Sequence, residues 1–457
     1  MPDDSAKDKL RFRDLAQHVR QVTSVNGMPV IWYWKGRFWI WSEGVYEPQH
    51  LEDTVLFVLK HLMSAGIDSS HWVATQVAHA LAAMSMLFIE KYPCWITTQG
   101  KERDGPYSIA LANKLVDINA LALDREARPE RPVVSSHDPA WFSTTRLPYA
   151  WDPDCQAPLA LKLFRENLTG PEAVAMLRGF MGYFLLPTTR EHKALFLYGK
   201  RGTGKSAIAN TVRVLLGKRN FSQLSISQFG NRFAMPRTEG MMLNITDEVC
   251  SVISAQAEER LKWFMSGSSM DIEDKNVRMY AMDPTAKLLV CLNEYPRFHD
   301  TEGAIWRRIC PLRCPNKVSD EKKDTRLYDE REGGKLVGEG PGIFNFAIRG
   351  LGEYLKAGRL LICQDSEREW ATASAENCGV RTFVTENLRS EPDGYVSSKN
   401  LRELYEHWCD QNGVDRRERV GVVPLGRVVR REFSGASSKS RRLAGMTVNG
   451  FTGVTLI

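Results

Sequence analysis

From residue 194 onward, short apolar runs alternate with longer segments in which apolar and polar positions are mixed. The apolar runs are ALFLY at 194–198, MMLNI at 241–245 and KLLVCL at 287–292. Such short continuous runs predict buried strands, and the mixed segments between them predict helices. Strands and helices that alternate in this way predict an α/β fold in which helices cover a largely parallel sheet.

The first part of the chain has a different pattern. The segment IWYWKGRFWIW at 31–41 places two aromatic runs on either side of Lys35-Gly36, which predicts a β-hairpin. Its rings suit either stacking on nucleic-acid bases or packing in the core of a small α/β domain. Core packing is favoured, because dense aromatics in a hairpin usually bury against neighbouring helices. Helical patterns follow at 51–65, 72–91, 159–168 and 171–184.

The last part of the chain alternates short helical patterns, such as 399–411, with Gly-rich residues that resemble strands at 445–457. A helix pair followed by a hairpin is typical of a winged-helix module, and the sequence therefore predicts one at this end.

Composition places the chain among soluble globular proteins. It has 457 residues, of which 43% are hydrophobic and 25% charged, enough for about two to four packed domains. The first residues lack an apolar leader, and the longest apolar stretch, Val77–Ile89, is too short to span a bilayer. We therefore expect a cytoplasmic protein without a membrane partner, in which Val77–Ile89 is a buried helix. The nine cysteines have no repeating spacing, so reduced thiols are expected.

The positive charge is concentrated near the carboxy-terminal end. The formal net charge is +6, yet residues 416–442 alone hold nine basic and two acidic side chains. The difference is +7, so the remainder of the chain is close to neutral. A basic run of this kind is either a solvated face or a contact surface for nucleic acid, and charge alone leaves both interpretations open.

A phosphate-binding motif follows the first of the predicted strands. Gly199-Lys200-Arg201-Gly202-Thr203-Gly204-Lys205-Ser206 fits the P-loop pattern and opens a helix predicted at 206–216. In such a loop the backbone N–H groups wrap the phosphates, the lysine reaches the β and γ phosphates, and the hydroxyl after it ligates Mg²⁺. The sequence thus predicts that ATP and Mg²⁺ are bound by Gly199, Gly202, Thr203, Gly204, Lys205 and Ser206.

Polar residues end the next two strands. Asp247 and Glu248 follow MMLNI, at the strand end where open α/β sheets bind ligands. We expect Asp247 to hold Mg²⁺ through water and Glu248 to polarise the attacking water. Asn293 ends the third strand and would place a neutral amide near the γ-phosphate. Arg307, which precedes Arg308, is either a surface ion-pairing residue or an arginine that acts on the nucleotide of a neighbouring subunit.

The order of these motifs makes the resemblance specific. GKRGTGKS, NITDE, LKWFMSGSSMDIEDK, LLVCLNEYPRFHD and WRRI resemble the superfamily 3 helicase domain of phage, plasmid and poxvirus primase-helicases. The resemblance implies an AAA+ type motor that forms a ring, of six subunits by expectation, and moves 3′ to 5′ on one DNA strand in a central channel. It also implies that Arg307 acts in trans, and that a β-hairpin with Lys275 and Asn276 at its tip grips the DNA.

The resemblance extends over most of the chain. It implies an amino-terminal α/β domain (1–155), a helical collar (156–190), the P-loop ATPase domain (191–350), a helical connector (351–380) and a basic winged-helix-like domain (381–457). Relatives often carry a primase domain ahead of the motor. Here Asp152-Pro153-Asp154 is the only nearby candidate for its metal site, so we expect a separate primase or polymerase partner.

Three functions are therefore compared. The first is an ATP-driven DNA helicase that unwinds forked duplex during replication of a phage, plasmid or other mobile element, with Arg430, Arg431, Arg441 and Arg442 as further DNA contacts. The second is a replication initiator that binds DNA and uses ATP only as a switch. The third is a P-loop kinase or metabolic ATPase, which the basic tail and the Arg307-Arg308 pair disfavour.

Overall fold

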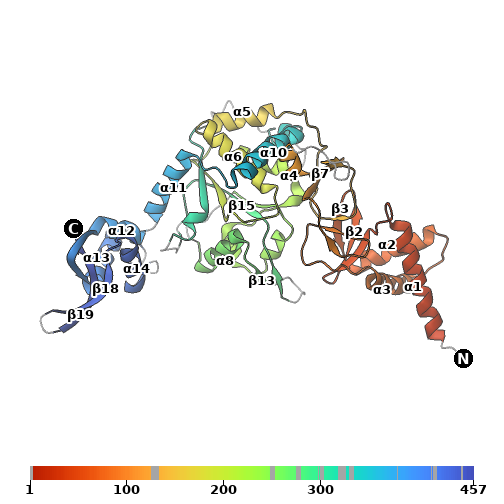
Figure 1. The fold of residues 1–457 in the computed structure, drawn as a ribbon, viewed down its shortest axis with the longest axis horizontal. Helices are drawn as coiled ribbons and strands as arrows, with labels where there is room; N and C mark the ends of the chain where they lie inside the picture. Colours follow the sequence, from red (N-terminus) through yellow and green to blue (C-terminus); the bar gives the residue numbers. More distant parts are fainter. Residues whose placement is uncertain are drawn as a thin grey trace.

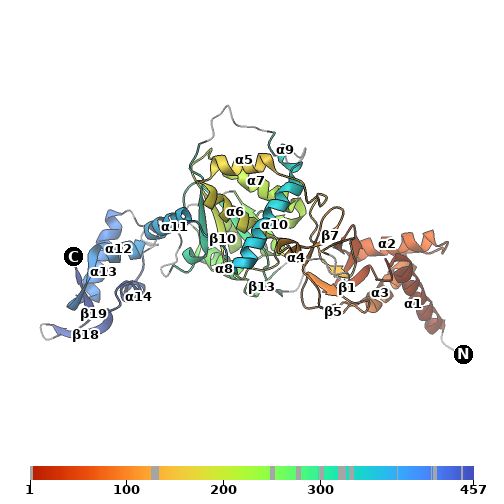
Figure 2. The ribbon, with the colours of Figure 1, turned by 45° about the horizontal axis from the view of Figure 1, so that its top comes forward.

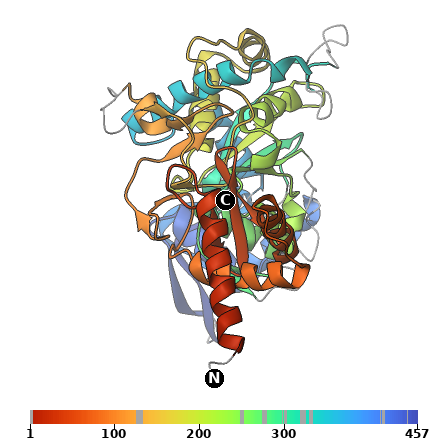
Figure 3. The same cartoon turned by 90° about the vertical axis from the view of Figure 1, so that its right-hand side faces the viewer.

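The computed structural model describes residues 4–124, 133–247, 253–273, 279–296, 298, 303–317, 326–328, 334–377, 379–412, 414, 419–443 and 446–457. The chain runs along the long axis of the molecule, with the two termini at opposite ends and a parallel sheet between them (Figure 1). Helix α1 stands at the amino-terminal end (Figure 3). Within these described ranges, every helix falls short of the length or the apolar character that crossing a membrane requires.

The amino-terminal part joins three helices to short antiparallel strands. Its elements are α1 (Asp4–Thr23), β1 (Ile31–Trp34), β2 (Arg37–Ser42), β3 (Val45–Gln49), α2 (Leu51–Ser64), α3 (His71–Met84), β4 (Cys94–Ile96), β5 (Glu102–Arg103), β6 (Ser108–Ala110), β7 (Leu115–Asp117), α4 (Ile118–Ala122), β8 (Val134–Ser135) and β9 (Trp141–Phe142). The predicted hairpin is confirmed, since β1 and β2 pair antiparallel with Trp34 opposite Arg37. Lys35 and Gly36 both have positive φ, 48° and 76°, which a two-residue turn of this kind requires.

The aromatic residues of the hairpin pack mainly inward, as the favoured interpretation expects. Trp32 is fully buried and Phe38 is 1% exposed. The helix predicted at 72–91 was wrong in its last seven residues, and the buried helix expected at Val77–Ile89 was wrong in its last five, because α3 ends at Met84. The backbone beyond it pairs with β1 instead: the amide of Tyr33 donates to the carbonyl of Ser85 at 2.7 Å, and the amide of Leu87 donates to the carbonyl of Tyr33 at 3.0 Å.

The central part contains the predicted parallel sheet. Its strands are β10 (Ala194–Tyr198), β11 (Phe221–Ser222), β12 (Leu243–Thr246), β15 (Lys287–Leu292) and β16 (Ile309–Arg313). They lie in the order β11-β12-β15-β10-β16, and each pair is parallel. Strand β15 therefore lies between β10, which leads into the P-loop, and β12, which leads to Asp247. Outside this sheet, β13 (Met270–Ile272) and β14 (Tyr280–Met282) form an antiparallel pair.

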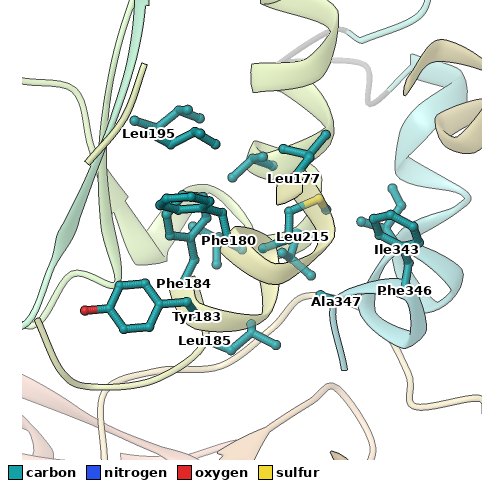
Figure 4. Close-up of a cluster of buried hydrophobic side chains, with 14 of the residues drawn as sticks. Leu177, Phe180, Tyr183, Phe184, Leu185, Leu195, Leu215, Ile343, Phe346 and Ala347 are labelled. Carbon is teal, nitrogen blue, oxygen red and sulfur yellow. The ribbon is translucent and has the colours of Figure 1, made fainter. Parts of the chain in front are cut away.

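Helices gather over the sheet (Figure 2). They are α5 (Pro158–Asn167), α6 (Pro171–Phe184), α7 (Lys205–Leu216), α8 (Ala255–Ser266), α9 (Gly334–Val337) and α10 (Gly340–Ala357), with 3₁₀ turns η1 (Lys218–Asn220), η2 (Ile226–Gly230), η3 (Met235–Thr238) and η4 (Trp306–Arg308). Side chains of α6, α7 and α10 meet those of β10 in one buried cluster (Figure 4). Helix α10 is continuous across position 350, where the sequence pattern places a boundary between the ATPase domain and the connector.

Helices α6 and α10 approach so closely that glycine is required at their contact. A Cβ atom on Gly182 would lie 2.3 Å from the amide nitrogen of Leu351, and one on Gly350 would lie 2.0 Å from the carbonyl oxygen of Arg178. Any larger side chain at either position would push the helices apart. This contact holds the helices that precede and follow the sheet against each other.

A lysine is buried where β15 begins. Lys287 is 2% exposed, and its ammonium donates to the carbonyls of Leu186 and, at 3.3 Å, Thr285. No carboxylate is among these hydrogen-bond partners, and burial lowers the pKa of Lys287 from 10.5 to about 7. Between those two pH values the unfolded chain binds more protons at this position than the folded chain does. The free energy of unfolding should therefore rise with pH through this window. The contribution of Lys287 to it should be least favourable below about pH 7.

Replacing this lysine by methionine tests the assignment. Lys287→Met should remove a pH-dependent contribution to the free energy of unfolding on the order of 4 kcal/mol between neutral pH and about pH 10. Denaturant unfolding of both proteins at several pH values measures it, because all other titrating groups are shared. The stability advantage of the variant should shrink as the pH rises. A difference between the two proteins that is independent of pH would contradict a neutralised buried lysine.

The carboxy-terminal part follows the long helix α11 (Gln364–Asn377). It contains α12 (Gly379–Asn387), β17 (Leu388–Ser397), α13 (Ser398–Gln411), α14 (Val422–Glu432), β18 (Ser437–Leu443) and β19 (Met446–Leu456), and its sheet has the antiparallel order β17-β19-β18. The helix predicted at 399–411 and the strand at 445–457 are both present. Strand β17 was not predicted, because Pro392 and Gly394 give it the composition of a loop and its pairing shifts register between Ser390 and Tyr395.

Candidate functional site

The P-loop lies between β10 and α7, at the carboxyl ends of the parallel strands. Gly202 and Gly204 have φ values of 82° and 81°, which L side chains rarely adopt. At Gly199 there is no space for a side chain, because a Cβ would lie 2.3 Å from the carbonyl oxygen of Cys314. Helix α7 begins at Lys205, directly after Gly204. The loop thus presents backbone N–H groups beside a helix N-terminus, an arrangement that binds phosphate.

Lys205 connects the P-loop to the neighbouring strand. Its ammonium donates to the carbonyl of Gly199 at 2.5 Å, to the carbonyl of Lys200 at 2.9 Å and to Oδ1 of Asn293 at 2.9 Å. The residue is 8% exposed, and burial lowers its pKa from the ordinary value. Since Asn293 ends β15, the strand next to β10, the structure brings together two of the residues that the sequence places in one site.

Asp247 ends β12 on the far side of β15. Its carboxylate pairs with the guanidinium of Arg213, whose side chain is only 5% exposed and whose Nη1 also donates to Oδ1 of Asn210 at 2.6 Å. Arg213 lies on α7, so this ion pair ties the P-loop helix to the carboxylate strand. The predicted partner Glu248 lies outside the described residues.

Arg213 was not predicted from the sequence. Its only signal is a basic residue within the apolar run Val212 to Leu216 of a helix that covers the sheet. A cation at such a position must find a buried anion, because an unpaired buried charge is costly. The nearest carboxylate that a strand end could supply is Asp247, so this pairing was accessible in principle.

Four further side chains lie in or beside the loop. The hydroxyl of Ser206 is on an exposed residue at the start of α7, whereas the hydroxyl of Thr203 donates within the loop to the carbonyl of Lys200 at 2.9 Å. The predicted contribution of Thr203 is therefore limited to its backbone N–H. Asn167, which ends α5, is 2% exposed and lies against Gly204 with its Oδ1 buried and without a hydrogen-bond partner. The side chain of Lys317 lies 4.0 Å from the Cβ position of Gly202.

These residues fit a nucleoside triphosphate with Mg²⁺. The glycine positions let the backbone of the loop approach the phosphates closely, and Lys205 and Lys317 supply positive charge. Ser206 and Asp247 offer the oxygen ligands that Mg²⁺ prefers. The donor set is therefore suitable for both predicted ligands.

Arg307 lies near the amino ends of the parallel strands, opposite the ends at which the P-loop lies. It precedes β16, whose first residue Ile309 pairs with Ala194 at the start of β10, whereas the P-loop follows Tyr198 at the end of β10. Four residue steps, about 13 Å along the strand, separate the amino end of β10 from its carboxyl end. Arg307 is exposed, and its carbonyl accepts a hydrogen bond from Lys193 at 2.5 Å. From this end its side chain does not reach the P-loop of its own subunit.

The residues predicted to contact DNA fall into two groups. Lys275 and Asn276 lie outside the described residues, between β13 and β14. Arg430 and Arg431 end α14, and Arg441 and Arg442 belong to β18; all four are exposed, and we refer to them as the basic surface.

One contact joins the two elements that form the basic surface. A guanidinium nitrogen of Arg430 donates to the hydroxyl of Ser438, which links the end of α14 to β18. Below it, Val428 and Val429 of α14 are buried, and a Cβ on Gly426 would lie 2.4 Å from the ring of Phe451. The helix therefore buries its apolar side against β19 and leaves its arginines on the outside.

The chain resembles known proteins in part of its sequence and in its fold. Residues 197–308, from β10 to the end of η4, match a family described as "Family of unknown function (DUF5906)". No curated protein matches the chain. Two solved structures of the NrS-1 C-terminal region, an A form apo structure and an apo structure, each have a TM-score of 0.51 and 11% identity, with 96% of this chain and 98% of that chain covered. At this identity the similarity shows a shared fold alone.

Proposed function

We propose that the chain is an ATP-driven DNA helicase motor that works as a ring of six subunits and moves 3′ to 5′ along one strand. The observation that carries the proposal is the position of Lys205, whose ammonium contacts both the P-loop and Asn293. The strand order supports it as well, because β15 inserts a polar strand end between the P-loop and Asp247. We infer that the central part is an AAA+ type ATPase domain.

The chemistry follows from the residues at the three strand ends. Backbone N–H groups of Gly202 and Gly204 and the ammonium of Lys205 would bind the phosphates, and the amide nitrogen of Asn293 would donate to the terminal phosphate. Ser206 and Asp247 would hold Mg²⁺, which neutralises phosphate charge when it is bound. Since Asp247 is paired with Arg213, the arginine orients this carboxylate toward the site and shares it with the metal. Glu248 would polarise the attacking water.

A ring supplies what one subunit lacks. Arg307 lies about 13 Å from its own P-loop along β10, so it contributes to hydrolysis only if it faces the nucleotide of a neighbour. In a closed ring every subunit offers one nucleotide pocket and one arginine to the next subunit. This arrangement explains how an exposed arginine near the amino ends of the strands serves the reaction.

The carboxy-terminal part supports the proposal that the chain binds DNA. Three helices on a three-stranded antiparallel sheet, with α14 presenting arginines, suit a winged-helix module that lies on phosphates. The competing initiator proposal shares this module but needs no unwinding. A metabolic ATPase needs neither the basic surface nor an arginine that acts in trans. We further propose that a separate primase or polymerase works with this motor in the replication of a phage or other mobile element.

The basic surface gives a prediction of its own. Arg430→Ala with Arg442→Ala should weaken binding to duplex DNA at low salt and flatten the salt dependence of the logarithm of affinity by up to about 1.8, because each phosphate contact contributes about 0.9. Fluorescence anisotropy over a salt series measures this slope. Lys356→Ala with Arg359→Ala removes the same charge from exposed positions at the end of α10 and should leave the slope unchanged. Equal slopes for both double variants would mean that the basic surface is solvated and does not contact DNA.

ATP hydrolysis with and without DNA tests the proposed function. The purified chain should hydrolyse ATP in the presence of Mg²⁺, and single-stranded DNA should raise the rate several-fold because strand movement and hydrolysis are coupled. A rate that DNA does not change would favour the metabolic ATPase. DNA binding with no hydrolysis in any condition would favour the ATP-switched initiator.

A further inference from the structure

A groove of about 820 Å³ lies between the amino-terminal part and the central part, outside the nucleotide site. One wall comes from the β1–β2 hairpin, with Lys35 and Arg37 at its turn. The opposite wall comes from the residues after η3 and from β14, including Glu239 and Tyr280. We refer to it as the interdomain groove. No residue of the P-loop, of β12 or of the basic surface lines it.

Aromatic side chains form much of the groove wall. Trp34 and Trp39 of the hairpin line it, although each is only 7% exposed because the same rings pack into the core behind it. Tyr92 and the half-buried Tyr280 line it from the other sides. Met279, next to Tyr280, is 59% exposed. Since the tryptophan rings are largely buried, the accessible part of this wall comes mainly from Met279 and the half-buried Tyr280, and an aromatic ring at such a position stacks on a base without sequence preference.

The charged residues of the groove are mainly basic. Among the described residues, Lys35, Arg37 and Arg219 line it, and Glu239 is the only acidic residue that does so. The carboxylate of Glu239 accepts a hydrogen bond from the hydroxyl of Tyr280 at 2.8 Å and keeps its charge. Arg219 is paired with Glu47, which leaves Lys35 and Arg37 as the basic residues on the hairpin side of the groove. The ammonium of Lys35 lies 4.4 Å from the centroid of the Trp34 ring, which places positive charge directly beside an aromatic face. Positive charge interleaved with rings is the chemistry of single-strand binding.

The groove is held in shape by contacts across it. Arg219 after α7 pairs with Glu47 of β3 at 2.9 Å, which links the central part to the amino-terminal sheet. Gly240 packs so closely on Tyr92 that a Cβ would lie 2.9 Å from the tyrosine oxygen. A preformed groove loses less conformational entropy when it binds a ligand than one that must first be assembled.

We propose that the interdomain groove binds a single strand of DNA, with Lys35 and Arg37 on its phosphates and its bases against the aromatic wall. The proposal rests on the proposed function, because it gives the translocated strand a path beyond the β13–β14 hairpin. Strand β14 supplies Tyr280 to the groove. The groove thereby connects the motor to the amino-terminal part, for which no role is otherwise assigned.

The test compares two double variants of the full chain. Lys35→Ala with Arg37→Ala should bind fluorescein-labelled oligo(dT) about tenfold more weakly at low salt and lose about 1.4 from the salt slope, since each contact to a single strand contributes about 0.7. Lys60→Ala with Lys101→Ala removes two exposed charges from the same part of the chain and should change neither quantity. Equal affinity of the two double variants for oligo(dT) would overturn the proposal.

A second measurement detects contact directly and does not rely on a loss of binding. A photoreactive amino acid at position 35 should crosslink to oligo(dT) on irradiation, whereas the same group at position 60 should not. Crosslinking at neither position, or equally at both, would overturn the proposal, as would capture of a free mononucleotide in preference to the strand.

Failure of this proposal is distinguishable from failure of the proposed function. Neither binding assay needs ATP hydrolysis, so both can succeed with a chain that does not unwind DNA. Conversely, the groove variant could bind oligo(dT) like its control while the wild-type chain unwinds DNA. That result would contradict the proposal for the groove and leave the proposed helicase function standing.

Discussion

ATP hydrolysis by the Lys205→Ala protein should fall by at least about a hundredfold, the effect expected when a group that stabilises phosphoryl charge is removed from a pocket that excludes water. The structure gives the reason. The ammonium of Lys205 is enclosed by the carbonyls of Gly199 and Lys200 and by Oδ1 of Asn293, so no other cation occupies this position in the described residues. Steady-state ATPase assays measure the loss.

Two matched variants control this result. Lys218→Ala removes the same charge from an exposed residue in η1, after the end of the same helix, and should hydrolyse ATP normally. Lys205→Arg keeps the charge but replaces a compact ammonium by a planar fork, and should recover little activity. Thermal unfolding shows whether each variant is folded. Wild-type hydrolysis in a folded Lys205→Ala protein would contradict the nucleotide site itself.

The Arg307→Ala protein should bind ATP nearly as well as the wild type but hydrolyse it about a thousandfold more slowly, as expected for loss of an arginine that neutralises developing charge on the γ-phosphoryl group. Because Arg307 lies in η4, before β16 and away from its own P-loop, its proposed role depends on a second subunit. Mixing it with Lys205→Ala protein should restore part of the activity, because some interfaces then pair an intact pocket with an intact arginine. ATPase assays at several mixing ratios measure the recovery.

Arg308 provides the control for this experiment. It adjoins Arg307, but its guanidinium donates to the carbonyl of Ala304 at 2.6 Å within its own turn, so Arg308→Ala should lower stability more than hydrolysis. If subunits exchange and mixing still restores nothing, Arg307 has no action between subunits. Recovery with Arg308→Ala in place of Arg307→Ala would move the role to Arg308.

The sequence predicted those parts of the fold and site that are encoded locally. Continuous apolar runs identified β10, β12 and β15, and the P-loop motif located Lys205 because its glycines and lysine are adjacent in the chain. The order of the strands could not be read, since pairing of β10 with both β15 and β16 depends on contacts far apart in sequence. Strand β17 was missed because its pairing with β19 overrides a loop-like composition.

Functional groups that meet only through tertiary contacts could not be predicted from local sequence patterns. Arg213 and Asp247 are separated by 34 positions and meet only when α7 packs on the sheet. The interdomain groove brings together Lys35 and Tyr280, which no periodicity relates. Of the predicted site residues, the structure places Lys205 and Asn293 in contact and sets Arg307 apart, and the proposal therefore has that arginine act on the nucleotide of a neighbouring subunit.

Strand displacement on a forked duplex tests the central claim most directly. The wild-type chain, supplied with ATP and Mg²⁺, should release a labelled strand from a fork with a 3′ single-stranded tail and act less well on a fork with only a 5′ tail. The Lys205→Ala protein should release none from either. Binding of the fork and hydrolysis of ATP without strand release on any tail would contradict the helicase and leave an initiator that uses ATP as a switch.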